Sequence, residues 1–206
     1  QYAKMLLGGA SLLSEHLEEI NDLNVFPVPD GDTGTNMYKT IEGGISEISS
    51  DEIESIGAIA KCFAHGVLLG ARGNSGVILS QIFRGFAEGI KEKQELVLVD
   101  VVEAFEKGVE RAYKAVLKPT EGTMLTVIRE ASEALTAEVS ANANISIVEA
   151  MEKMVAKAKE SLENTPNDIC HLRQNSDIFF EKSGLSKFSG NFIPYILAAP
   201  ITISMH

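Results

Sequence analysis

The sequence has few of the features that mark secreted, metal-clustered or membrane-spanning proteins. Its 206 residues include only two cysteines, Cys62 and Cys170, which form neither a disulfide framework nor a cluster with metal-binding spacing. We therefore expect a reducing, cytoplasmic setting. The longest apolar stretch, 192–203, is short and contains two prolines, whereas a membrane-spanning helix needs about 20 apolar residues. The sequence predicts no membrane span, and the absence of a basic region at its start predicts no signal peptide.

Basic residues are also scarce. Lysine and arginine total 18 against 29 aspartates and glutamates, which gives a formal net charge of −11. Such a surface repels the phosphates of nucleic acids, so we expect no nucleic-acid partner. An anionic cofactor would need metal ions or backbone amides to hold it. Hydrophobic residues make up 45% of the chain and charged residues 23%, which excludes disorder over the whole length.

Alternation of the kind seen in β-strands is nearly absent before residue 168, and apolar residues recur at helical spacing instead. We therefore predict an all-α fold. The predicted helices cover 2–22, a segment opening at Thr33, a segment after the capping box Ser49/Glu52, then 74–89, 98–116, 123–139, and a last helix that a second capping box, Ser146/Glu149, begins and Pro166 ends.

The composition changes after residue 168. The stretch 169–206 holds three basic and two acidic residues, against 15 and 27 in the stretch before it, and contains four of the nine phenylalanines. No clear helical period runs through it. We therefore divide the chain into a domain over 1–168 and an atypical C-terminal tail over 169–206, which either continues the last helix or is poorly ordered.

The most informative motif is N-V-F-P-V-P-D-G-D-T-G-T-N-M, residues 24–37. Its two prolines stiffen the approach, and Gly31 allows a tight bend. Asp30 and Asp32 flank this bend, so their carboxylates can converge on one hard cation. The helix that opens directly afterwards offers free backbone N–H groups, which suit a metal-bound phosphate. The alternative is a simple turn followed by a threonine helix cap.

Two further glycine-containing segments precede predicted helices. The segment G-A-R-G-N-S-G, residues 70–76, has three glycines spaced three apart and can bind an anion at the following helix N-terminus. It lacks the lysine of a P-loop and the preceding strand of a Rossmann motif, and its alternative is a tight helix–helix connection. The segment G-T-M-L-T, residues 122–126, taken by itself is an ordinary helix cap. No histidine has a spacing that indicates a catalytic base.

The first two motifs, in this order and spacing, resemble the amino-terminal kinase domain of the bacterial fatty acid kinase ATP-binding subunit, a member of the DhaL-type superfamily that includes the nucleotide-binding subunit of dihydroxyacetone kinase. The resemblance covers about residues 2–166. It implies a barrel of about eight antiparallel helices with ATP and Mg²⁺ at one end. The tail lacks the Asp-Ala-Gly-Gly turn that closes on the nucleotide in this family.

The resemblance also implies roles for individual residues. Asp30 and Asp32 match catalytic aspartates that hold two Mg²⁺ ions against the phosphates of ATP. Asn24 takes the place of a third metal-binding aspartate of dihydroxyacetone kinase. Thr33 replaces the histidine of dihydroxyacetone kinase, which favours the fatty acid kinase branch. The residues that match positions beside the phosphates of ATP or ADP are Thr33, Thr35, Asn36, Gly73, Asn74, Ser75 and Gly76. Thr123 and Met124 match the segment that lies along the nucleoside.

The implied activity is transfer of the γ-phosphoryl group of ATP to a fatty acid carboxylate, presented by a separate fatty-acid-binding carrier protein of the DegV type. Because a carboxylate is already ionised at neutral pH, no general base is required, in agreement with the lack of a candidate base. The complete subunit of this family has further domains, through which a homodimer could form. The alternatives are a dihydroxyacetone (glycerone) type kinase subunit and a nucleotide-binding subunit without turnover.

Overall fold

A computed structural model describes residues 1–24, 30–48 and 55–173, and these residues form eight helices and no strand. The all-α prediction is therefore confirmed. No helix in this part of the chain is long and apolar enough to cross a membrane. The helices are α1 (Tyr2–Glu15), α2 (Leu17–Asp22), α3 (Thr33–Ile48), α4 (Ile56–Gly70), α5 (Gly73–Gly89), α6 (Leu98–Lys114), α7 (Met124–Ala141) and α8 (Ile147–Arg173).

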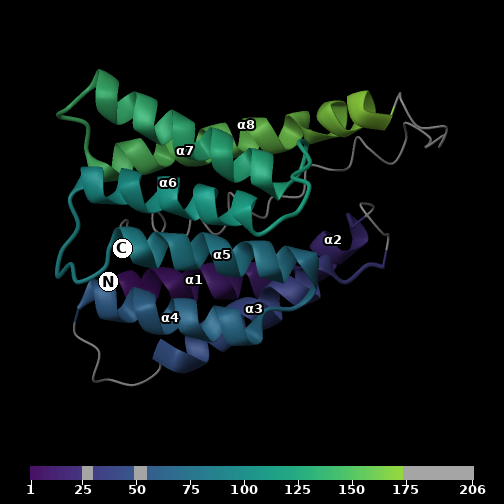
Figure 1. Ribbon diagram of the computed structural model, residues 1–206, viewed down its shortest axis with the longest axis horizontal. Coiled ribbons are helices and arrows are strands. Elements are labelled where there is room, and N and C mark those ends of the chain that lie inside the picture. Colours follow the sequence, from purple (N-terminus) through teal and green to yellow (C-terminus); the bar gives the residue numbers. More distant parts are fainter. Residues whose placement is uncertain (25–29, 49–54, 174–206) are drawn as a thin grey trace.

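Helices that follow one another in the sequence also pack side by side. From α3 to α8 each helix packs on the next, and α1 and α2 pack against α3. The chain runs up and down, so α3, α5 and α7 all begin at one end of the bundle (Figure 1). We call this end the site end, and the opposite end, where α4, α6 and α8 begin, the far end. All three glycine-containing motifs therefore lie at the site end.

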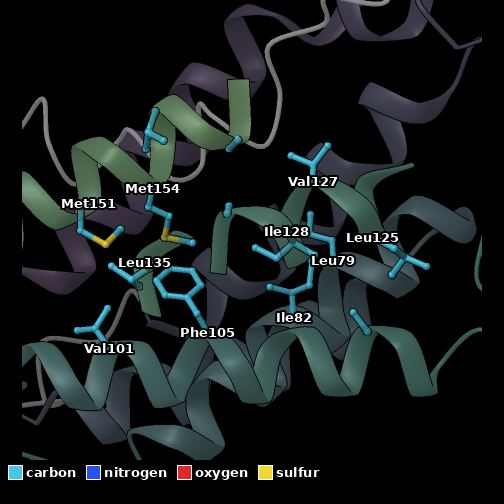
Figure 2. Close-up of a cluster of buried hydrophobic side chains, with 14 of the residues drawn as sticks. Leu79, Ile82, Val101, Phe105, Leu125, Val127, Ile128, Leu135, Met151 and Met154 are labelled. Atoms are coloured by element: carbon cyan, nitrogen blue, oxygen red, sulfur yellow. The ribbon is translucent and has the colours of Figure 1, made fainter. Parts of the chain in front are cut away.

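One core of apolar side chains joins these helices. Residues of α5, α6, α7 and α8 converge in it, and Phe105, Leu135 and Met154 are each at most 8% exposed (Figure 2). Removing these side chains from water supplies the main driving force for the packing of α7 and α8. The residues labelled in the figure are Leu79, Ile82, Val101, Phe105, Leu125, Val127, Ile128, Leu135, Met151 and Met154.

Glycines bring two pairs of helix backbones into direct contact. A Cβ atom on Gly66 of α4 would lie 2.2 Å from the carbonyl oxygen of Gly43 of α3. A Cβ on Gly85 of α5 would lie 2.2 Å from the carbonyl oxygen of Lys107 of α6. No real side chain fits at these distances, so glycine is required for the close packing of α3 on α4 and of α5 on α6.

An apolar cavity of about 620 Å³ lies between the helices toward the far end. Its lining includes Tyr2 and Met5 at the start of α1, Phe86 near the end of α5, and Met151 near the start of α8. Among the described residues that line it there is no lysine or arginine side chain. The cavity therefore offers no cationic side chain for phosphate. The three glycine-containing motifs lie at the other end of the bundle.

Some predicted helix boundaries differ from the structure. The helix predicted over 2–22 is two helices, because the backbone of His16 (φ −104°, ψ 11°) departs from helical geometry between α1 and α2. The capping box Ser49/Glu52 lies outside the described residues. Helix α4 begins at Ile56, and the hydroxyl of Ser55 caps it by accepting a hydrogen bond from the backbone N–H of Ala58 at 3.1 Å.

The prediction that Pro166 ends the last helix is wrong, since α8 continues to Arg173. A proline has no N–H to donate to the carbonyl four residues earlier, which here belongs to Leu162. The hydroxyl of Thr165 donates to this carbonyl at 2.8 Å instead, so the carbonyl is satisfied and the proline costs less than usual. The capping role predicted for Ser146 is confirmed, because its Oγ accepts from the N–H of Glu149 at 3.1 Å. The remainder of the predicted tail, 174–206, lies outside the described residues.

Candidate phosphate and metal site

A side-chain hydrogen bond joins two polar residues of the first motif. The Nδ2 of Asn24 donates to the Oδ1 of Asp30 at 2.5 Å. Gly31 follows with φ +65°, and Asp32 lies exposed just before α3. The two prolines of the motif fall in 25–29, outside the described residues. The structure thus brings Asn24 and Asp30 into contact and keeps the carboxylates of Asp30 and Asp32 at the surface.

The first turn of α3 is held by Asn21, a residue that sequence reasoning missed. The backbone N–H of Thr35 donates to the Oδ1 of Asn21 at 3.1 Å, and the Nδ2 of Asn21 donates to the Oγ1 of Thr35 at 3.0 Å. A Cβ on Gly34 would lie 2.4 Å from the carbonyl oxygen of Leu17, so α2 rests directly on this turn. The hydroxyl of Thr35 therefore fixes the start of α3, while Thr33 opens the helix half-buried.

The second motif packs against the first through α3. A Cβ on Gly73 would lie 2.6 Å from the Nδ2 of Asn36, and one on Gly76 would lie 2.3 Å from the Oγ1 of Thr40. This buried Oγ1 accepts from the backbone N–H of Arg72 at 3.2 Å and donates to the carbonyl of Asn36 at 2.7 Å. Thr40, which sequence reasoning also missed, thereby joins the two motifs into one structural unit.

The N-terminus of α5 presents backbone N–H groups at this junction. Arg72 occupies the N-cap position with an extended backbone and no side-chain capping bond. Its guanidinium turns back and donates to the carbonyl of Ala71 at 2.9 Å. Asn74 is exposed and Ser75 half-buried in the first turn. First-turn N–H groups carry a partial positive charge, so this turn is suited to bind an anion.

The third motif begins α7 at the same end of the bundle (Figure 1). The hydroxyl of Thr123 accepts from the N–H of Leu125 at 3.3 Å and donates to the carbonyl of Thr120 at 2.8 Å, so it caps the helix. Met124 packs against the core. Among the residues that the structure describes, no hydrogen bond joins this motif to the first two.

The three motifs share one backbone feature. The described part of the chain has three glycines with positive φ, namely Gly31 (+65°), Gly73 (+58°) and Gly122 (+74°), one in each motif. Each lies at the start of a helix or within two residues of it. Glycine adopts this conformation without the steric cost that other residues meet, so the three loops depend on it. Such loops can turn successive N–H groups toward one anion.

Comparison with known families identifies the family of this chain. The model of the DAK2 domain matches residues 27–184. The chain belongs to the DAK2 domain family. This is a DhaL-type, kinase-related family, and domains of this type bind ADP or ATP. The family part of the resemblance is therefore confirmed.

Relatives of this DAK2 domain include uncharacterized proteins from three strains of Staphylococcus aureus, namely bovine RF122, USA300 and NCTC 8325. Each is 49% identical over 173 residues, which make up 84% of this chain and 31% of the relative. The chain thus spans about a third of the length of the curated relatives it matches.

The donor groups of the DAK2 domain fit a magnesium ion that arrives with a nucleotide. Among the described residues, no group of three or more histidines, cysteines, aspartates or glutamates is placed to hold a metal. Asp30 and Asp32 supply two exposed carboxylates, and the amide of Asn24 lies against one of them. Magnesium is usually bound by one or two carboxylates together with substrate phosphates, which is the donor set that this loop and a bound nucleotide would supply.

Proposed function

We propose that this DAK2 domain binds ATP with Mg²⁺ and transfers the γ-phosphoryl group to a fatty acid carboxylate presented by a carrier protein, giving an acyl phosphate. The observation that carries the proposal is the junction at Thr40, where α3, which begins directly after the acidic loop, contacts the glycine turn that opens α5. A carboxylate pair beside a helix N-terminus is the combination that a metal-bound phosphate needs.

Each part of the junction has a distinct role in this proposal. Asn24, Asp30 and Asp32 would hold the metal, which when bound neutralises phosphate charge and aligns the transferred group. The backbone N–H groups at the start of α5 and the hydroxyl of Ser75 bind phosphate oxygens. Gly73 allows the phosphate to approach the backbone closely. A side chain at this position would already collide with Asn36.

The chemistry of the acceptor follows from what the motifs lack. None of the three motifs contains a histidine. A hydroxyl acceptor must lose a proton during phosphoryl transfer and benefits from a base, whereas a carboxylate is ionised at neutral pH. The site therefore suits a carboxylate better than an alcohol. The presence of Thr33 in place of the histidine of dihydroxyacetone kinase supports the same choice.

The test is an assay with two acceptors and a control without acceptor. The chain is incubated with ATP and Mg²⁺ plus a fatty-acid-loaded carrier protein, dihydroxyacetone, or no acceptor, and ADP is measured together with acyl phosphate trapped by hydroxylamine. We expect ADP and trapped product with the loaded carrier. ADP formed with dihydroxyacetone would overturn the choice of acceptor, and no ADP with any acceptor would overturn the assignment of turnover.

The residue assignments are tested separately by nucleotide binding. We expect Asp30→Ala and Asp32→Ala to weaken Mg-dependent ATP binding by at least about tenfold, because the phosphate charge then lies uncompensated beside an acidic surface. Asp22→Ala removes an exposed carboxylate of α2 and serves as the matched control, with unchanged binding. Circular dichroism should show the same helix content in all three variants. Unchanged ATP binding in both test variants would mean that the loop is a simple turn.

A further inference from the structure

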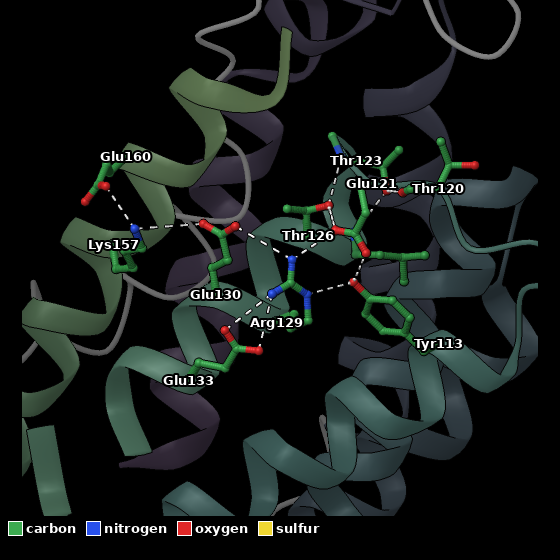
Figure 3. A network of polar contacts seen from close by, with 12 residues as sticks. Tyr113, Thr120, Glu121, Thr123, Thr126, Arg129, Glu130, Glu133, Lys157 and Glu160 are labelled. Carbon is green, nitrogen blue, oxygen red and sulfur yellow. Dashed lines mark hydrogen bonds and ion pairs between the residues drawn. The ribbon is translucent and has the colours of Figure 1, made fainter. Parts of the chain in front are cut away.

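Arg129 of α7 is the centre of a polar network that reaches three helices and one loop (Figure 3). Its Nη2 donates to the Oε2 of Glu121 at 2.9 Å, and its Nε donates to the hydroxyl of Tyr113 at 3.2 Å. This hydroxyl donates in turn to the Oε1 of Glu121 at 3.1 Å. Arg129, Tyr113 and Glu121 thus form a closed set of hydrogen bonds between α7, the end of α6 and the loop that connects them.

The same network is hydrogen-bonded to the backbone of the third motif. The Oε2 of Glu121 also accepts from the hydroxyl of Thr126 at 2.7 Å, and that hydroxyl accepts from the backbone N–H of Gly122 at 2.9 Å. Thr126 is buried, and Arg129 is half-buried. A continuous chain of hydrogen bonds therefore runs from the guanidinium of Arg129 to the residue with positive φ that precedes Thr123.

The charges in this chain are maintained at neutral pH. Burial acts to raise the pKa of Glu121, but hydrogen bonds from Thr126 and Arg129 outweigh it and hold the pKa below its ordinary value. Burial acts to lower the pKa of Arg129, but its bonds to Tyr113, Glu121 and Glu133 outweigh it and raise the pKa. Hydrogen bonds between charged partners are stronger than neutral ones, so this set of bonds favours one conformation of the loop.

On the other side, the network continues to α8. Nη1 of Arg129 donates to both carboxylate oxygens of Glu133 at 3.3 Å, and Nη2 lies 3.7 Å from Glu130. Glu130 in turn lies 3.9 Å from Nζ of Lys157 on α8. Arg129 is therefore also held by Glu130 and Glu133 of its own helix, and its hydrogen bond to Glu121 is the one that reaches the third motif.

We propose that Arg129 is a positioning residue for nucleotide binding, which acts through Glu121 and Thr126 to hold the backbone of 122–124 against the nucleoside. The inference rests on the proposed function, since it assumes that the third motif lines a nucleotide. The inference can be tested separately from phosphate binding, because the proposed phosphate-binding junction at Thr40 shares no hydrogen bond with this network among the described residues. Loss of Arg129 should thus affect the nucleoside end of the ligand and spare the phosphate end.

The experiment compares the Mg²⁺-dependent binding of ADP with that of inorganic pyrophosphate, by calorimetry, in the parent and in Arg129→Ala. We expect ADP to bind about tenfold more weakly to Arg129→Ala, in line with the loss of a charge-assisted hydrogen bond, and pyrophosphate to bind as before. Arg129→Lys keeps the charge but not the planar fork, so we expect it to recover part of the affinity for ADP. Lys153→Ala removes another α7–α8 ion pair, that with Glu138, and is the matched control.

The possible outcomes are distinct. Equal ADP affinity in the parent and in Arg129→Ala overturns the positioning role, as does equal weakening of ADP and pyrophosphate. A parent that binds neither ligand overturns the proposed function, and this inference with it. If Arg129→Ala does not fold, Glu121→Gln decides, because it keeps the size of the side chain and the bond from Thr126. We expect this variant to weaken ADP binding selectively, and unchanged ADP binding would contradict the proposal.

Discussion

The interface between α3 and α4 and the interface between α7 and α8 are built in opposite ways. In the first, Gly66 meets the backbone of Gly43, and no side chain fits at this contact. In the second, apolar side chains such as Met154 fill the centre, and ion pairs such as Lys153–Glu138 lie at the edge. A backbone contact tolerates no addition, whereas side chains can rearrange. The α3–α4 half of the bundle, which holds the candidate phosphate and metal site, should therefore tolerate larger side chains at its helix contacts less well than the α7–α8 half.

The largest effect is expected from Gly66→Leu. Its Cβ would lie 2.2 Å from a backbone oxygen, so α3 and α4 must move apart. We expect the free energy of unfolding to fall by about 3 kcal/mol, measured by urea denaturation. The control is Ala137→Leu on the exposed face of α7, which should change it by no more than about 0.5 kcal/mol. Similar losses in both variants would remove the contrast between the two interfaces.

A smaller effect is expected from Gly73→Ala at the start of α5. The alanine must adopt φ +58° and place its Cβ 2.6 Å from the side chain of Asn36, which can give way more easily than a backbone. We expect a loss of about 1–2 kcal/mol in the free energy of unfolding, together with weaker ATP binding. Val77→Ala, at an exposed position of the same helix, is the control for stability. A fully stable Gly73→Ala would show that this turn has no need of glycine.

Ser161→Ala removes a buried polar group in the α7–α8 half of the bundle. Ser161 of α8 is 1% exposed, and its Oγ has no hydrogen-bond partner among the described residues. Because a buried hydroxyl without a partner costs free energy, we expect its removal to raise the free energy of unfolding by up to about 1 kcal/mol. Thermal denaturation monitored by circular dichroism measures the change. A clear decrease in stability would show that the hydroxyl contributes to the packing of α8.

The smallest effect is expected from Lys153→Ala. Lys153 forms ion pairs with Glu138 and Glu149, but its side chain is 45% exposed, so solvent screens these pairs. We expect a loss of no more than about 0.5 kcal/mol, which decreases further at high salt. A loss as large as that of Gly73→Ala would mean that ion pairs determine the stability of the α7–α8 interface.

The sequence predicted the helices better than it predicted the contacts between them. The starts of α5 and α7 follow from apolar periodicity and capping, which are local properties, and agree within one residue with the prediction. The prediction that Pro166 ends the last helix failed because the hydroxyl of Thr165 donates to the carbonyl of Leu162, which the proline cannot reach with an N–H. Ser55 was missed although it caps α4 in the ordinary way, because the capping box Ser49/Glu52 offered an earlier start.

The candidate site was predicted in part. The motif around Asp30 and the glycine turn around Gly73 could be found because each is a local pattern. The structure joins them through Thr40 and supports the first of them with Asn21. The roles of both residues depend on contacts between separate helices that no spacing reveals. The metal and nucleotide roles of Asn24, Asp30 and the residues matched to ATP stay predictions.

The packing of consecutive helices also bears on how the chain folds. Since α3 to α8 each contact the next helix in the sequence, most interfaces form between segments joined by a short connection. Closing such short loops costs little chain entropy, and proteins dominated by local contacts fold within about microseconds to milliseconds. The α5–α6 pair, with a close backbone approach at Gly85, offers a compact hairpin from which the bundle can grow in both directions. The first motif and the glycine turn lie before or on α3 and α5, which are not consecutive, so their contact through Asn36 and Thr40 forms only when these two helices pack together.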